Sequence, residues 1–177
     1  MGISMTERSF SRRDLLLSLF GRWRVNNVPG GKTGFGARER EIDALLEQGD
    51  YAQAASMLQE LLQSVPGHVQ ARQKLGYCLL QTQDPEAAAK ELKSVLQEKP
   101  GDNFCLLYLG LALARQDDLQ QALHYWEQYF DPEKTLIQRE INLLLALKDT
   151  SGLDSAKEIA ERLEQSISKQ QRKDQGF

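Results

Sequence analysis

The chain has 177 residues, 41% of them apolar, which is enough to form a continuous core within the size range of a single domain. Only 7% of the residues are aromatic and only 5 are proline, so we expect an all-α fold with almost no strand. Residues 1–40 carry eight basic and three acidic side chains, which gives +5, while residues 41–177 carry fourteen and twenty-two, which gives −8. The acidic body argues against binding to nucleic acid.

Residues 1–34 form a basic arm that is separate from the rest of the chain. A capping pattern at residues 11–14 precedes a short apolar run that ends at Gly21, which predicts a helix over residues 11–20. The glycines between Pro29 and Gly34 predict a flexible linker after this helix. The arm residues that we expect to recognise a partner are Arg12, Arg13, Leu16, Phe20, Arg22, Trp23 and Arg24.

The arm resembles known sequences in two ways. Residues 11–13 followed by Leu16 resemble a twin-arginine export signal, but the apolar run is short and no small-residue cleavage site follows, so we do not expect export. Together with residues 21–24, the same string resembles the start of bacterial ferredoxin-type accessory proteins of respiratory molybdoenzymes, without their cysteine clusters. Three roles stay open: a recognition helix, a peripheral membrane contact through residues 8–24, and a latch over an apolar groove.

Alanine recurs every 34 residues through the remainder of the chain. Self-similarity at a fixed period is the sequence signature of a repeat architecture. Each repeat is predicted to hold two helices, because an aspartate precedes the second helix as a cap and a Pro-Gly pair breaks the chain after it. The alanines are Ala54, Ala88, Ala122 and Ala156, the caps are Asp50, Asp84 and Asp118, and the breaks are Pro66-Gly67 and Pro100-Gly101.

A Leu-Gly pair recurs at one offset in the first helix of the second and third repeats. The pairs begin at Leu75 and Leu109. Glycine lowers the stability of a helix, so its recurrence indicates that a neighbouring helix must approach closely there. We expect that neighbour to be the second helix of the same repeat, at its small Ala88 or Ala122.

The order of Leu-Gly, then Ala, then Pro within each period resembles the tetratricopeptide repeat family. The resemblance spans about residues 35–170 and is specific in the two middle repeats. In the outer repeats Ile42 and Leu144 replace the small residue, and Lys134 stands where the third repeat would have its proline. The resemblance implies an α-solenoid of about four helix-turn-helix repeats, over residues 35–68, 69–102, 103–136 and 137–170, followed by a frayed tail over residues 171–177.

The first helix of each repeat is expected to line the concave side of the solenoid, which offers an extended groove to a peptide or helix. If Leu75 and Gly76 face the core, helical rotation turns the opposite side of the helix toward the groove. That side is rich in apolar residues, which indicates either a partner site or a surface covered by the tail or arm of the chain itself. The predicted groove residues are Tyr77, Gln81, Phe104, Leu107, Tyr108, Leu111, Arg115, Ile141 and Leu145.

The sequence shows no pattern for catalysis or for binding a cofactor or metal ion. His68 and His124 have no neighbouring ligand set, and the acidic residues fall at caps and solvent-facing helix positions. Residues 31–33 lack the first glycine and the preceding strand that a phosphate-binding loop needs. Cys78 and Cys105 lie in apolar helical runs, where a buried free thiol is ordinary.

The sequence therefore predicts a protein-interaction scaffold that binds an apolar or amphipathic peptide or helix in its concave groove. The alternative hypothesis is a membrane-associated or respiratory-enzyme assembly factor that uses the arm, and a third is a homo-oligomer formed through the apolar face. No run approaches the length of about eighteen apolar residues that a spanning helix needs. We therefore expect a cytoplasmic location, with peripheral contact at the inner membrane as the alternative.

Overall fold

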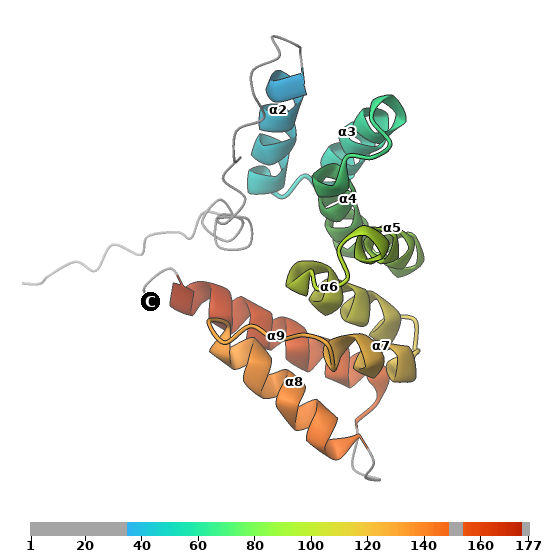
Figure 1. The fold of residues 1–177 in the computed structure, drawn as a ribbon. Coiled ribbons are helices and arrows are strands. Elements are labelled where there is room, and N and C mark those ends of the chain that lie inside the picture. Colours follow the sequence, from blue (N-terminus) through green and yellow to red (C-terminus); the bar gives the residue numbers. More distant parts are fainter. Residues whose placement is uncertain (1–34, 149–153, 175–177) are drawn as a thin grey trace, which may run out of the picture.

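The computed structural model describes residues 35–148 and 154–174, and every regular element in these two ranges is an α-helix (Figure 1). The prediction of an all-α helical-repeat fold is confirmed for this part of the chain. The basic arm, with its predicted helix and recognition residues, lies outside the described residues. The helices are α2 (Phe35–Gln48), α3 (Tyr51–Ser64), α4 (Val69–Gln81), α5 (Pro85–Glu98), α6 (Asn103–Ala114), α7 (Leu119–Trp126), α8 (Thr135–Leu147) and α9 (Ala156–Asp174).

Side-chain caps begin the helices from α3 to α7. Asp50, Asp84 and Asp118 each accept a hydrogen bond from the backbone amide three residues later, at 3.1, 3.1 and 3.0 Å. Asp102 caps α6 in the same way, and the ring of His68 caps α4. Each cap gives a partner to an amide that has none inside its own helix. The three aspartate caps predicted from the sequence are confirmed.

The turn within each of the first three repeats has one backbone form. Gly49, Gln83 and Asp117, which occupy the same position in successive repeats, have φ angles of 77°, 66° and 64°. The amide that follows each of them bonds back to the preceding helix, as in the 2.9 Å bond from Asp84 N to Leu79 O. This is the Schellman pattern of a helix end. The backbone conformation of this turn therefore repeats with the same period as the sequence.

The recurring glycines admit large side chains from the next helix. A Cβ atom on Gly76 would lie 2.6 Å from Leu92 Cγ, and one on Gly110 would lie 2.5 Å from Trp126 Cε2. Trp126 is fully buried, and its indole N–H donates to the carbonyl of Leu107 at 3.2 Å. The predicted close approach is confirmed. The side chains that require the glycines are Leu92 and Trp126, four residues after the repeat alanines, and not the alanines themselves.

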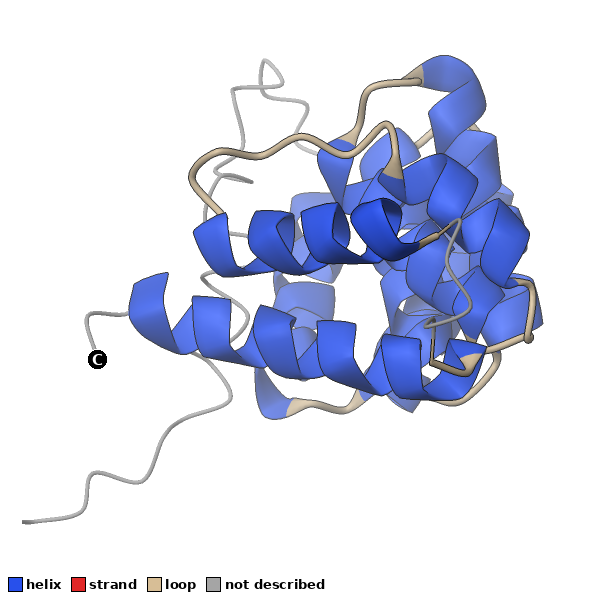
Figure 2. Ribbon diagram, turned by 90° about the horizontal axis from the view of Figure 1, so that it is seen from below, coloured by secondary structure: helices blue, strands red, loops and turns tan. Residues whose placement is uncertain are grey.

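The regular stacking of helix pairs ends after α7. From α2 to α7 each helix packs along its successor, but α7 ends at Trp126 and residues 127–134 form an irregular connection to α8. Helix α8 meets α7 only at its margin and packs mainly against α9, which also lies against α6 (Figures 1 and 2). The last helix pair therefore does not continue the solenoid but folds back along α6.

The start of α8 is capped from a distant helix. Lys134 occupies the cap position and makes no side-chain capping bond. The backbone amide of Leu136 donates instead to the side-chain oxygen of Gln170, on α9, at 2.8 Å. Gln170 is 1% exposed and donates through Nε2 to Asp174 at 2.8 Å. This buried amide fixes the position of α8 on α9 in the absence of an aspartate cap.

Helix α9 extends further than the sequence suggested. The helix runs to Asp174, whereas a frayed tail was expected from residue 171. Gln171 is only 6% exposed. The beginning of the predicted tail is thus packed helix, because this turn of α9 faces the side of α6.

Candidate functional site

Four aromatic side chains meet on the inner side of the first three repeats. The ring of Tyr77, on α4, lies 5.8 Å from that of Tyr51 and 5.2 Å from that of Tyr108, both in edge-to-face geometry. The ring of Phe104 lies 4.6 Å from that of Tyr108. Such pairs add about 0.5–1.5 kcal/mol each beyond the burial of area. These four residues, the aromatic cluster, join α3, α4 and α6 into one surface.

The predicted groove residues divide into two groups by their exposure. Those on the aromatic cluster and on the faces toward α9 are mostly covered, whereas those at the ends of helices keep contact with solvent. Burial in the first group comes from neighbouring helices of the same chain. The buried group is Tyr77, Leu107, Tyr108, Leu111 and Ile141, and the partly exposed group is Gln81, Phe104, Arg115 and Leu145.

The burial of Leu111 and Ile141 corrects the expectation of an open groove along all four repeats. These side chains are 1% and 0% exposed. Because α9 packs along α6, the C-terminal helix itself covers much of the apolar side of α6, which was the alternative drawn from the sequence. The signal for this lay in Ile159, Leu163 and Ile167, an apolar stripe at a spacing of four residues that requires a surface to bury it.

Arg115 forms hydrogen bonds with two other helices of the chain. Its Nη1 donates to the carbonyl of Leu80, at the end of α4, at 2.6 Å. Its Nε donates to Glu164, on α9, at 3.0 Å. The guanidinium therefore ties α4, α6 and α9 together. The sequence predicts a partner-binding role for Arg115, whereas its contacts in the structure join helices of the same chain.

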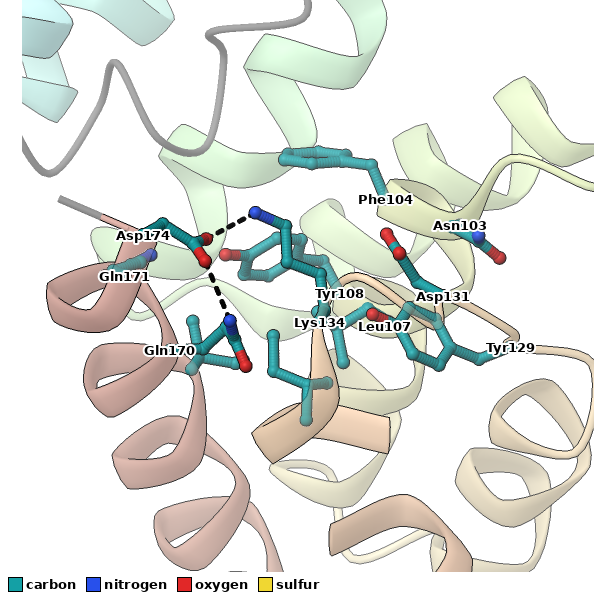
Figure 3. Close-up of a pocket in the computed structure, with 12 residues that line it drawn as sticks. Asn103, Phe104, Leu107, Tyr108, Tyr129, Asp131, Lys134, Gln170, Gln171 and Asp174 are labelled. Atoms are coloured by element: carbon teal, nitrogen blue, oxygen red, sulfur yellow. Dashed lines mark hydrogen bonds and ion pairs between the residues drawn. The ribbon is translucent and has the colours of Figure 1, made fainter. Parts of the chain in front are cut away.

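A cavity of about 110 Å³ lies between α6 and α9, next to the aromatic cluster (Figure 3). Leu107, Ile137 and Ile167 contribute apolar walls. The ion pair between Lys134 and Asp174 lies at its partly exposed edge. Sequence reasoning missed this cavity, because its walls come together only where α9 leaves the regular stack.

Polar groups also line the cavity. Tyr108, Tyr129 and Gln171 all contribute to its surface and are 3%, 5% and 6% exposed. Burial raises the pKa of both phenols, and the proximity of Tyr129 raises the pKa of Tyr108 further. Both hydroxyls are therefore protonated and uncharged at neutral pH.

The two thiols are buried, as expected from the sequence. Burial raises the pKa of Cys78 to about 12, and it raises the pKa of Cys105 as well. The buried Gln73, which sequence reasoning did not single out, donates to Asp102 at 2.7 Å and to Cys105 Sγ at 3.7 Å. This amide secures the beginning of α6 against α4.

The histidines have structural neighbours. His68 pairs with Glu39 at 3.1 Å, and His124 lies against the ring of Tyr125. Over residues 35–148 and 154–174, no group of three or more His, Cys, Asp or Glu side chains is arranged to hold a metal ion. In those same ranges no helix combines the length and the apolar character needed to cross a bilayer.

Comparison with protein families concerns the regularly capped part of the chain. Residues 45–104, from the end of α2 to the start of α6, match the tetratricopeptide repeat model. Residues 45–104 therefore have the sequence pattern of tetratricopeptide repeats. Repeats of this kind stack into curved scaffolds whose concave surfaces bind other proteins.

Comparison with solved structures concerns the fold of nearly the whole chain. The chain is similar to the structure described as "MamA RS-1 ArsTM double mutant", with a TM-score of 0.58 and 20% sequence identity. The alignment covers 92% of this chain and 86% of that one. At this identity the likeness shows a shared fold. The comparison with curated proteins gave no match.

Proposed function

We propose that this chain is a protein-interaction scaffold that binds an apolar or amphipathic segment of another protein over its aromatic cluster. The observation that carries the proposal is the cluster itself, whose rings come from three helices and whose neighbouring ring centroids lie 4.6 to 6.1 Å apart. Tyr51 and Phe104 are its partly exposed members. Aromatic side chains are enriched where interfaces hold their partners most strongly.

The charge of the scaffold favours a basic segment. Residues 41–177 carry a net charge of −8. Complementary charge increases the rate of association and selects among partners more than it adds affinity. We therefore expect a segment with apolar anchors and a positive net charge.

Affinity capture with matched variants tests the proposal. Phe104→Glu places a charge at the exposed edge of the aromatic cluster, and we expect it to reduce capture of the partner at least about tenfold, which corresponds to about 1.4 kcal/mol. Gln97→Glu adds the same charge to an exposed position on α5 and should capture as the parent does. Circular dichroism of both variants should match the parent. Equal capture by Phe104→Glu and the parent would reject the proposal.

A further inference from the structure

Three buried polar groups in the cavity between α6 and α9 form no hydrogen bond with the part of the chain that the structure describes. They are the hydroxyls of Tyr108 and Tyr129 and the side-chain amide of Gln171. Native proteins give partners to nearly all buried polar groups, because an unsatisfied one lowers stability. Three such groups in one cavity indicate a place for a molecule that supplies their partners.

The charges near the cavity disfavour an anionic guest. Lys134 and Asp174 pair with each other at its edge, and the carboxylate of Asp131, which accepts the amide of Glu133 at 3.1 Å, also lines the cavity. An anionic guest would therefore be buried beside a like charge and without a counter-charge, which is costly. An uncharged tip that both donates and accepts a hydrogen bond matches an amide and two hydroxyls.

The size and walls of the cavity favour a single ring. Leu107, Ile137 and Ile167 present only apolar atoms from their side chains, and the volume is about 110 Å³. An enclosed apolar cavity of about 150 Å³ is large enough to bind benzene. A somewhat smaller cavity that is open at one edge can hold a six-membered ring whose stem leaves through that edge.

We propose that this cavity is an anchor subsite for a tyrosine side chain of the bound segment. The guest ring packs between Leu107 and Ile167, and its hydroxyl exchanges hydrogen bonds with Tyr108 and Gln171 on the side of the cavity toward α9. The subsite rests on the proposed scaffold function, because Phe104 borders both the cavity and the aromatic cluster. Tyrosine is among the commonest anchors of protein interfaces because it joins a large apolar ring to a polar tip.

Titration of the full chain with p-cresol and with toluene, followed by amide NMR shifts, tests the subsite. The two probes share the ring and methyl group, and only p-cresol carries the hydroxyl of tyrosine. We expect p-cresol to bind about tenfold more tightly, the ratio that corresponds to one hydrogen bond of ordinary net strength. Gln171→Leu and Tyr108→Phe should each reduce that ratio to about twofold or less.

Stability measurements show whether these variants act on binding or on the fold. Both remove a polar group that has no partner, so both should melt at the same temperature as the parent or higher. Gln165→Leu, on an exposed face of α9, is the matched control and should keep the tenfold ratio. Equal affinity of the two probes overturns the subsite. So does a lower melting temperature of Gln171→Leu with an unchanged ratio, which would mean that the amide serves the fold, for example through an ordered water.

The two proposals fail in distinguishable ways. If p-cresol does not bind while Phe104→Glu still abolishes capture, the subsite is overturned and the scaffold function stands. If p-cresol binds preferentially while Phe104→Glu captures like the parent, the scaffold surface is overturned. In that outcome the assignment of the cavity to a partner's tyrosine is wrong as well.

Discussion

The first three helix pairs and the last pair share one sequence period but pack differently. In the first three, an aspartate cap and a Schellman turn recur once in every repeat, and each helix lies along the next. In the last pair the start of α8 is capped by Gln170 from α9, and the pair turns back along α6. The difference teaches that periodic apolar residues alone do not fix the stacking. The caps and breaks between helices set it.

The largest expected effect concerns the glycines that hold the regular part together. Gly110→Ala should lower the free energy of unfolding by about 3 kcal/mol, because the new Cβ would overlap the buried indole of Trp126. Gly76→Ala should cost about 1 kcal/mol, because Leu92 can change rotamer and the helix gains from alanine. Urea unfolding measures both.

Two further variants separate the overlap from any general cost of alanine. Gly101→Ala, where no atom lies within 4 Å of the new Cβ, should change stability by less than about 0.5 kcal/mol. Trp126→Leu should relieve part of the cost of Gly110→Ala in a double-mutant cycle, with a coupling of about 1 kcal/mol or more. Additive losses in that cycle would refute the overlap.

A smaller effect is expected where the last pair depends on its distant cap. Gln170→Leu should cost about 2 kcal/mol, because it leaves the amide of Leu136 without its partner in a partly buried site. Hydrogen exchange should then accelerate in α8 and α9 but not in α3 to α5. Unchanged exchange in α8 would show that Gln170 does not secure the last pair.

The smallest effect is expected at an ordinary cap of the regular part. Asp84→Ala removes the side-chain acceptor of the Ala87 amide at an exposed helix start and should cost about 1 kcal/mol. Lys134→Ala removes a cap residue that makes no capping bond, so its only expected cost is that of the partly exposed ion pair with Asp174, at most about 1 kcal/mol. Thermal unfolding compares the two. A loss of about 2 kcal/mol from Lys134→Ala would contradict the assignment of α8 capping to Gln170.

The sequence predicted the regular part well because its signals are local. Asp50, Asp84 and Asp118 lie next to the amides that they cap, and the Leu-Gly offset repeats within single helices. It also indicated the departure at Lys134, where the proline of the pattern is missing. The period did not indicate the direction of the last pair, because that depends on contacts between α9 and α6 that are distant in sequence.

The candidate site was predictable only in its outline. The sequence placed Tyr77, Phe104 and Tyr108 on one side of their helices, and the structure brings these rings together. It also assigned Leu111 to an open surface, whereas α6 is covered along that side. Of the cavity polar groups, Tyr108 is among the predicted groove residues, whereas Gln171 escapes notice because the sequence places it in a frayed tail. Both errors arise because the sequence analysis extends the regular solenoid through α8 and α9, whereas these helices do not continue it.

A spin label on α9 tests most directly whether the last helix pair folds back along α6. Cys78 and Cys105 are buried, so a nitroxide at exposed Ser168→Cys can be attached selectively. The structure predicts strong broadening of amide resonances in α6 as well as in α8, and little in the distant α3. Broadening confined to α8 and α9, with α6 unaffected, would contradict this account and remove the cavity with it.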